Sequence, residues 1–187
     1  MKKYYKMTIA GCERELPLCK ASDSLAIAGF VIFGDVELTC ACAAELLKRA
    51  PEFDYMVAPE AKAIPLIHEM ARQSGRNEYC LVRKAPKLYM DGVFETQVQS
   101  ITTRGVQHLY MDGKDARLIK GKKVLILDDV ISTGESLAAV EKLVNEAGGE
   151  IAGRMAILAE GDAAKRNDII FLEALPLFDG DFNPLPF

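Results

Sequence analysis

The chain has 187 residues, 50% of them hydrophobic, and a formal net charge of −4. The length suits one domain with a small appendage, and the acidic balance argues against a non-specific nucleic-acid binder, which needs a basic surface. No apolar run reaches the roughly 18 residues of a membrane helix, and the first residues lack the apolar segment of a signal peptide. We therefore expect a cytoplasmic protein with reduced cysteines that binds neither membrane nor nucleic acid.

The N-terminal segment, residues 1–35, differs in pattern from the rest of the chain. Residues 4–10 and 13–19 predict two short strands around Gly11-Cys12, and residues 24–34 continue this apolar segment. A helix follows over residues 36–49, rich in Ala and Leu and stopped by Pro51.

Strands and helices then alternate, which is typical of a parallel α/β sheet. The tail after residue 178 holds Pro184 and Pro186 and is expected to be irregular. We expect a single domain over 1–187, with a core over 36–178 and a tail over 179–187. The predicted strands are 55–59, 79–82, 123–127, 153–158 and 168–175, and the predicted helices are 63–73 and 136–147.

Residues 83–120 interrupt the alternation. Segments 95–101 and 106–111 alternate weakly around Thr103-Arg104-Gly105, which predicts an antiparallel ribbon. Asp91-Gly92 and Asp112-Gly113 suggest hinges, and long insertions in compact domains are usually functional or mobile. We expect a flexible loop over 88–112; Glu95 and Arg104 lie on it without an assignable role.

The stretch Val124 to Ser136 combines three features. Four apolar residues predict a buried strand, the adjacent carboxylates Asp128 and Asp129 follow, and the hydroxyl-rich run from Ser132 to Ser136 opens a helix. Backbone N–H groups at a helix start bind anions, and paired carboxylates accept from a diol or hold a hydrated cation. A sugar 5-phosphate meets both demands. The alternative is an ordinary strand end capped by Asp and a Thr-Gly turn. A P-loop is excluded because Gly121-Lys122 lacks the upstream Gly and the following hydroxyl.

This stretch resembles the signature of type I phosphoribosyltransferases. The resemblance implies a doubly wound parallel sheet with a small N-terminal hood and a flexible antiparallel ribbon, and a homodimer. It also implies Mg²⁺ carried in with 5-phosphoribosyl 1-pyrophosphate. Asp128 and Asp129 would be the catalytic pair and would contact the ribose hydroxyls. The Mg²⁺ carried by the substrate would bind near the same two carboxylates. The expected 5′-phosphate residues are Ser132, Thr133, Gly134, Glu135 and Ser136.

Two further stretches resemble the pyrophosphate site of this family. Residues 58–65 follow a strand and open a helix, like the pyrophosphate loop of purine phosphoribosyltransferases and the matching turn of the Gram-positive purine repressor's effector domain. Three cations after the next strand are similar to an Arg-Lys-x-x-Lys cluster of adenine phosphoribosyltransferases. An ordinary helix start and a solvated loop are the alternatives. The implied residues are Glu60, Ala61, Lys62, Ala63, Arg83, Lys84 and Lys87.

The base site is implied by a partial match. Residues 29–35 are similar to the Gly-apolar-apolar-Phe-Arg-Asp segment of adenine phosphoribosyltransferases, but carry one extra apolar residue and Gly34 where the Arg stands. Phe30 or Phe33 would stack on a purine, unless both are core residues. Glu160 would accept from an exocyclic amine or cap a helix.

The resemblance implies a purine phosphoribosyltransferase that takes adenine as its base. Two alternatives stay open: a non-catalytic domain that senses phosphoribosyl pyrophosphate, and a transferase for another base such as xanthine or orotate.

Overall fold

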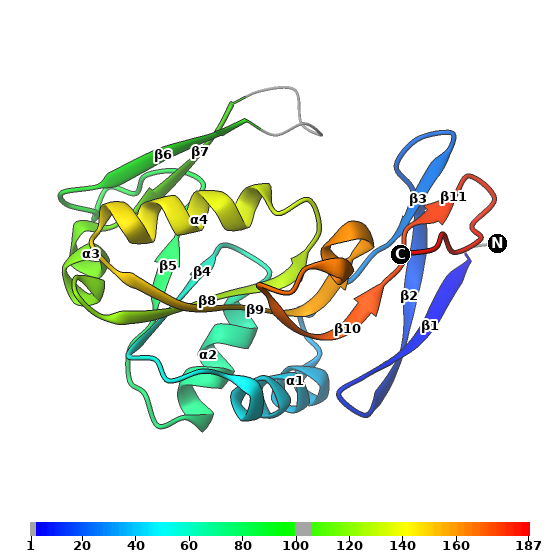
Figure 1. Ribbon diagram of the computed structural model, residues 1–187, viewed down its shortest axis with the longest axis horizontal. Coiled ribbons are helices and arrows are strands. Elements are labelled where there is room, and N and C mark those ends of the chain that lie inside the picture. Colours follow the sequence, from blue (N-terminus) through cyan, green and yellow to red (C-terminus); the bar gives the residue numbers. More distant parts are fainter. Residues whose placement is uncertain (1–2, 100–105) are drawn as a thin grey trace.

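The computed structural model describes residues 3–99 and 106–187, and its centre is a five-stranded parallel sheet (Figure 1). The strand order is β10-β9-β8-β4-β5, so the direction of winding reverses between β4 and β8. Such a reversal defines a doubly wound sheet and places a crevice at the carboxyl ends of the two strands. The predicted fold class is confirmed. The strands are β4 Tyr55–Pro59, β5 Cys80–Val82, β8 Lys123–Ile131, β9 Glu150–Glu160 and β10 Ile170–Leu175.

Helices cover both faces of this sheet because its strands are apolar on both sides. In β8, Leu125 and Leu127 pack in the cluster of α1 and α2, whereas Val124 and Ile126 pack in the cluster of α3 and α4. A strand buried on both faces is expected to be continuously apolar. The helices are α1 Val36–Arg49, α2 Ile64–Gln73, α3 Gly113–Ile119 and α4 Glu135–Glu146, with a 3₁₀ turn, η1, over Gly161–Lys165.

The hood is a four-stranded antiparallel sheet built from both ends of the chain (Figure 1). The prediction of an irregular tail is therefore wrong for its first residues, since β11 pairs with β3 through Phe178 and Ala26. Phe178 is 1% exposed, and its ring lies 5.1 Å from that of Tyr5. Burial of this side chain holds the tail in place. The strands are β1 Tyr4–Ile9, β2 Cys12–Lys20, β3 Leu25–Ala28 and β11 Phe178–Asp179.

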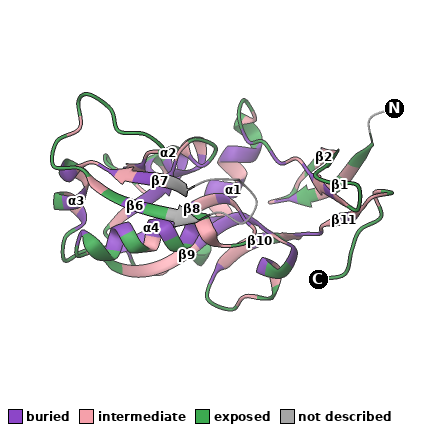
Figure 2. Cartoon of the chain, turned by 90° about the horizontal axis from the view of Figure 1, so that it is seen from above, coloured by how far each residue is buried: buried purple, intermediate pink, exposed green. Residues whose placement is uncertain are grey.

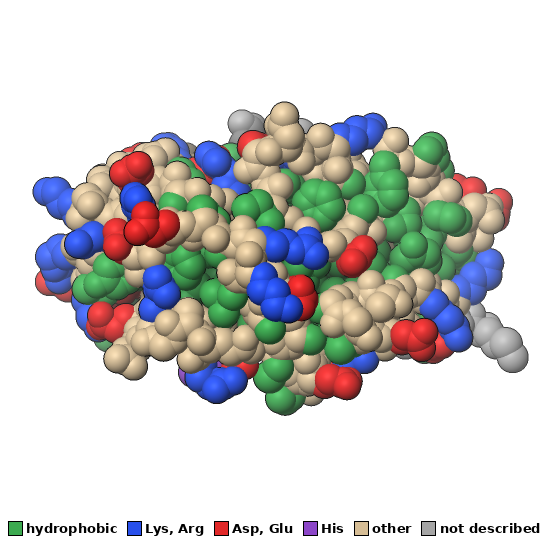
Figure 3. All heavy atoms as spheres, turned by 60° about the horizontal axis from the view of Figure 1, so that its bottom comes forward, with side chains coloured by type: hydrophobic (Ala, Val, Ile, Leu, Met, Phe, Trp, Pro, Cys, Tyr) green, Lys and Arg blue, Asp and Glu red, His purple; other side chains and the backbone are tan. Residues whose placement is uncertain are grey.

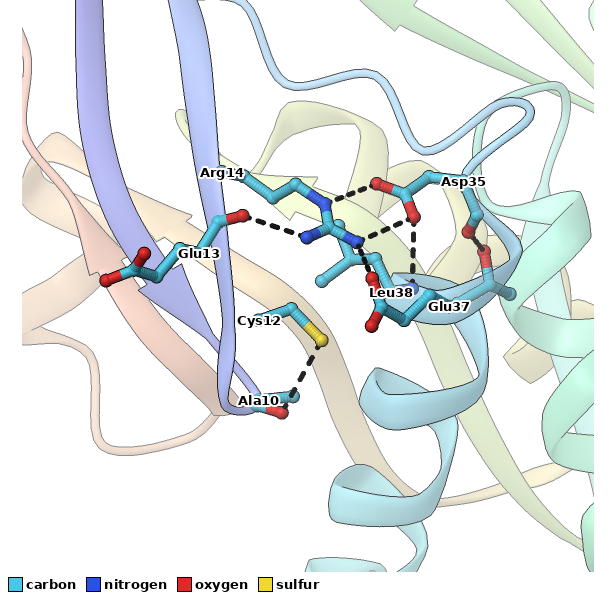
Figure 4. Close-up of polar contacts among 8 residues, drawn as sticks. Ala10, Cys12, Glu13, Arg14, Asp35, Glu37 and Leu38 are labelled. Atoms are coloured by element: carbon cyan, nitrogen blue, oxygen red, sulfur yellow. Dashed lines mark hydrogen bonds and ion pairs between the residues drawn. The ribbon is translucent and has the colours of Figure 1, made fainter.

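A cluster of charged side chains joins the hood to the first helix of the core (Figure 4). Asp35 caps α1 by accepting from the backbone N–H of Leu38 at 3.1 Å. Arg14 of β2 donates to both oxygens of the same carboxylate, at 2.6 and 2.9 Å, and to Glu37 at 2.8 Å. The hydrogen bonds from Arg14 lower the pKa of Asp35 below its ordinary value. The helix start and the hood strand thus share one anchor.

The ribbon predicted in the insertion is present as β6 Phe94–Gln99 and β7 Val106–Met111. Its inner face is buried in the cluster that contains α4, through side chains such as Leu109 and Met111. At its base, the N–H of Gly113 donates to Asp91 at 3.0 Å, so the two Asp-Gly pairs lie against each other. Residues 100–105, including Arg104, lie outside the described residues. The mobility of 88–112 stays a prediction.

Helix α3 was not predicted from the sequence. It spans seven residues, too few to show a helical repeat of apolar positions. Asp112, interpreted as part of a hinge, instead caps this helix by accepting from the N–H of Lys114 at 3.1 Å. The carboxylate of Asp115 then receives the N–H of Leu81 at 3.4 Å, so the helix covers the edge of β5.

Burial divides the molecule into a dry core and partly covered outer elements. Figure 2 shows buried residues along β8 and exposed residues along the ribbon and parts of the hood. On the face that carries α1 and α2, hydrophobic side chains gather towards the hood (Figure 3). The segment between hood and core exposes Val31 at 58%, Phe33 at 51% and Val36 at 72%. This linking segment therefore has apolar surface to offer to a ligand or another chain.

Replacement of Phe178 by Ala tests the role of the tail strand. We expect Phe178→Ala to lower the free energy of unfolding by about 3–5 kcal/mol, because it removes a fully buried aromatic ring. Phe187→Ala is the matched control, since that ring is 48% exposed at the end of the same tail. Urea unfolding measures both, and equal stability of the two variants would contradict a structural tail.

Candidate functional site

The carboxyl end of β8 extends beyond its neighbour β4. The two strands pair only from Tyr55 with Val124 to Val57 with Ile126, whereas β9 pairs with β8 as far as Ile131. The prediction that the strand ends at residue 127 is therefore wrong. Pairing with β9 on one side outweighs the low strand propensity of two Asp residues. The unpaired edge beyond Ile126 opens a cleft at the reversal of the sheet.

The acid pair lies on this projecting end. A carboxylate at a strand end that faces a cleft is not expected in the core, but Asp129 is 5% exposed, so that expectation is wrong for Asp129. Nζ of Lys62 lies 3.0 Å from its Oδ2 and compensates the buried charge. The geometry makes this contact an ion pair rather than a hydrogen bond, so Oδ2 lacks a hydrogen-bond donor within the described part of the chain. This oxygen is enclosed in the structure, with Lys62 as the cation beside it.

Asp128 is half-buried beside it. Its Oδ1 accepts the backbone N–H of Asp129 at 2.8 Å. Burial, and next to it the neighbouring charge of Asp129, raise the pKa of Asp128 well above its ordinary value. Two carboxylates held together in this way are typical of a functional site, because the fold gains no stability from them.

Two adjoining cavities surround the pair. One, of about 300 Å³, lies between the loop after β4 and the end of β8; the other, of about 100 Å³, lies within the loop before α4. Asp128 and Ser136 line both, so the two cavities form one continuous site. The larger cavity is lined by Pro59, Glu60, Ala61, Lys62, Lys84, Leu109, Asp128, Asp129, Val130 and Ser136. The smaller is lined by Asp128, Val130, Ile131, Ser132, Thr133, Gly134, Ser136 and Leu137.

The loop before α4 has the form of an anion site. Gly134 takes the left-handed conformation with φ 82°, and no side chain caps the helix from that position. The hydroxyl of Thr133 accepts the N–H of Glu135 at 3.5 Å. Helix N–H groups that lack a capping side chain bind anions or water.

The predicted pyrophosphate residues divide into two groups. Glu60, Ala61, Lys62 and Lys84 line the larger cavity, whereas Arg83 and Lys87 do not. Ala63 is buried at the start of α2.

The guanidinium of Arg83 is directed at a side chain of the protein. Its Nη1 lies 3.0 Å from Glu60, and the N–H of Lys84 donates to the same carboxylate at 2.7 Å. Burial raises the pKa of Glu60, but these two donors lower it by more than burial raises it. The pKa of Glu60 therefore lies below its ordinary value. Glu60 thereby ties the loop after β4 to the loop after β5.

The three base candidates have different surroundings. Phe30 is 4% exposed and packs in the main hydrophobic cluster, whereas Phe33 is half exposed. Glu160 ends β9, next to the projecting end of β8. Burial raises its pKa, and the Ser132 hydroxyl and Lys62 offset part of that rise. Glu160 thus joins the network of the cleft, whereas neither Phe30 nor Phe33 lines the two cavities, and of these two rings Phe33 is the exposed one.

Leu109 is a cleft residue that the sequence did not single out. It lies on β7, pairs with Thr96 across the ribbon, and lines the larger cavity opposite the loop after β4. The weak alternation of segment 106–111 predicted a strand but not which face of that strand is buried. The buried face is the one that packs against α4.

The fold and the site define an α/β protein with an anion-sized loop, an acid pair and a cationic loop around one crevice. Residues 41–178 match the family model described as the phosphoribosyl transferase domain. The chain therefore belongs to the phosphoribosyltransferase family.

Two of the relatives are purine phosphoribosyltransferases. The chain is 38% identical over 109 residues to adenine phosphoribosyltransferase of a Thermotoga species, covering 58% of this chain and 60% of that protein. It is 33% identical over 113 residues to hypoxanthine/guanine phosphoribosyltransferase of Methanococcus voltae, covering 60% and 56%. The chain thus spans less than two thirds of the length of these relatives.

A solved structure shares the fold. The crystal structure of adenine phosphoribosyltransferase from Thermoanaerobacter pseudethanolicus superposes with a TM-score of 0.66 at 23% identity, covering 76% of this chain and 84% of that one. At this identity the likeness concerns the fold alone.

The raised pKa of Asp128 predicts how the stability of the protein depends on pH. A carboxyl whose pKa is higher in the folded than in the unfolded state costs stability as pH rises above its unfolded value, about 3.9. We expect Asp128→Asn to unfold near the wild-type temperature at pH 4 and at a higher temperature at pH 8. Thermal unfolding across this range measures the difference.

A control substitution removes a carboxylate from the other end of β8, where Asp54 accepts the N–H of Lys123 at 2.9 Å. Asp54→Asn loses a bond to a charged acceptor at the surface and should not gain stability. A wild-type protein more stable than Asp128→Asn at pH 8 would contradict a destabilising acid pair.

Proposed function

We propose that the protein transfers the 5-phosphoribosyl group of phosphoribosyl pyrophosphate to a purine, adenine first, giving a nucleoside 5′-monophosphate and pyrophosphate. The observation that carries this proposal is the continuity of the two cavities through Asp128 and Ser136. A ligand with a phosphate at one end and a diol in its middle fits that arrangement. The named relatives support the purine as acceptor.

The two ends of the sugar donor are assigned to the two loops. The 5′-phosphate lies in the loop of Ser132, Thr133, Gly134, Glu135 and Ser136, where helix N–H groups and hydroxyls donate to it. The pyrophosphate lies beside Lys62 and Lys84, with Glu60, Ala61 and Ala63 forming the loop. Arg83 positions that loop through Glu60, and Lys87 adds a positive charge nearby.

The acid pair acts on the ribose between these ends. Asp128 and Asp129 accept hydrogen bonds from the two ribose hydroxyls. When the bond from the anomeric carbon to the pyrophosphate oxygen breaks, positive charge develops on the sugar, and fixed carboxylates stabilise it. A purine nitrogen then bonds to the anomeric carbon. The work of the site is electrostatic, because no side chain forms a covalent bond to the substrate.

Mg²⁺ fits this site as a companion of the donor. Within residues 3–99 and 106–187, no group of three or more His, Cys, Asp or Glu side chains could hold a metal. Mg²⁺ is commonly bound by one or two carboxylates together with substrate phosphates, and Asp128 and Asp129 would supply them. When bound, the ion neutralises charge on the leaving pyrophosphate.

The assembly is proposed to be a cytoplasmic homodimer. Leu88 is fully exposed and Tyr89 is 69% exposed, next to the basic residues after β5. Burial of these side chains against a second subunit would remove apolar surface from water. None of the helices described here has the length and hydropathy needed to cross a membrane. Sedimentation would give the oligomeric state.

Activity with a panel of bases tests the main proposal. Pyrophosphate release with Mg²⁺ and the donor should be fastest with adenine. Asp128→Asn and Asp129→Asn should each lower kcat/KM tenfold or more, because a bond to a charged acceptor is worth about 1.5–3 kcal/mol and about 1.4 kcal/mol is tenfold in rate. Asp54→Asn should leave kcat/KM unchanged.

Other outcomes separate the alternatives. Turnover with hypoxanthine, guanine, xanthine or orotate instead of adenine would change the base but keep the mechanism. Tight binding of the donor without turnover on any base would favour the sensor of phosphoribosyl pyrophosphate. Full activity of both Asn variants would show that the acid pair is structural.

The two phenylalanines make a second test. Phe33→Ala should raise the KM for the purine about tenfold, since stacking on a base is worth about 1–3 kcal/mol, and leave the KM for the donor unchanged. Phe30→Ala is the contrasting variant, because Phe30 is buried. It should lower the melting temperature instead. An unchanged purine KM for Phe33→Ala would remove Phe33 from the base site.

A further inference from the structure

The side chain of Arg166 lies against the phosphate loop. A β-carbon built on Gly134 would stand 2.6 Å from Nη1 of Arg166. A side chain there would have to displace the guanidinium, which is the far end of a flexible side chain. The left-handed backbone is what favours glycine at position 134, and the guanidinium of Arg166 occupies the space beside it. The guanidinium contacts the backbone at the point where the loop becomes helix α4.

Two anchors fix the guanidinium in this place. Nε and Nη2 of Arg166 donate to the two carboxylate oxygens of Asp168 at 2.9 and 2.7 Å, which leaves Nη1 directed at Gly134. The backbone N–H of Arg166 donates to Ala163 at 3.1 Å, at the end of η1. Bidentate pairs of this kind hold both partners in a defined orientation. The Arg166 side chain is 32% exposed, so most of it is packed.

The charge at this position suits a phosphate. Asp128 lines the loop cavity, so an incoming dianion meets a carboxylate there. The guanidinium of Arg166 adds a permanent positive charge on the Gly134 side of the same loop. Helix N–H groups and a fixed cation acting together bind an anion more tightly than the helix alone.

We propose that Arg166 is a positioning residue for the 5′-phosphate of the sugar donor. Oriented by Asp168, it supports the backbone of the phosphate loop at Gly134 and offsets the carboxylate that lines the loop cavity. This inference rests on the proposed function, since it assumes that the loop takes a sugar phosphate.

Two ligands separate this role from a general effect on the cleft. Ribose 5-phosphate reports on the phosphate loop, and pyrophosphate reports on the loop after β4; calorimetry gives both dissociation constants. Arg166→Gln should weaken ribose 5-phosphate about tenfold, the loss of one charge-assisted contact, and pyrophosphate less than about twofold. Arg166→Lys keeps the positive charge but cannot form the two-bond pair with Asp168. Its affinity for ribose 5-phosphate should lie between those of wild type and Arg166→Gln.

Asp168→Asn distinguishes orientation from charge alone. It makes the site more positive, so a purely electrostatic role predicts tighter binding of ribose 5-phosphate. A positioning role predicts weaker binding, because Arg166 loses its anchor. The matched control is Arg72→Gln, which removes an Arg paired with Glu69 at 2.8 Å on helix α2. It should change neither constant.

Each result decides the matter. Wild-type affinity of Arg166→Gln for ribose 5-phosphate, equal weakening of both ligands, or tighter binding by Asp168→Asn would overturn the role of Arg166. A wild-type protein that binds pyrophosphate but no ribose 5-phosphate would overturn the proposed phosphate loop itself, and with it this inference. If Arg166→Gln does not fold, the affinities of Arg166→Lys and Asp168→Asn decide.

Discussion

The site depends on the unequal pairing of strand β8. On one side β9 accompanies it to Ile131, and on the other β4 leaves it after Ile126. The projecting end carries two carboxylates into a cleft that the neighbouring strand does not fill. Burying a carboxylate destabilises the fold unless a positive charge lies beside it. Nζ of Lys62 supplies that charge 3.0 Å from Asp129. The loop after β4 must therefore lie where its lysine reaches the acid pair.

The loops around the crevice are held together by contacts between Glu60, which lines it, and Arg83, which does not. Glu60 receives Arg83 and the N–H of Lys84, and so links the ends of β4 and β5. The Arg83 backbone in turn exchanges two hydrogen bonds with Tyr110 of the ribbon, at 2.7 and 2.8 Å. Through this chain of contacts the loop after β4, the loop after β5 and the ribbon are joined beside the cleft.

Sequence reasoning found the elements with strong patterns and missed those fixed by tertiary contacts. The apolar run before Asp128 and the helix from Val36 to Arg49 follow from local periodicity. The continuation of β8 through two Asp residues depends on β9, which no local pattern reveals. The inward turn of Leu109 depends on α4, and the pairing of Arg83 with Glu60 depends on two loops that are distant in the sequence. Motif order predicted that the loops after β4 and β8 meet, and both line the cleft, but it did not predict the partner of each charge.

The hood has a consequence for how the chain folds during synthesis. Its third strand pairs with β11, so Ala26 has no partner in β11 until Phe178 has been synthesised, 152 residues later in the chain. Until then β3 has an open edge, and the nascent chain exposes a template for unwanted strand pairing. Contacts between such distant residues also form slowly, because a long loop must close first. The hairpin of β1 and β2 can form early, but the complete hood is a late event, and a chain truncated before Phe178 would keep that edge exposed.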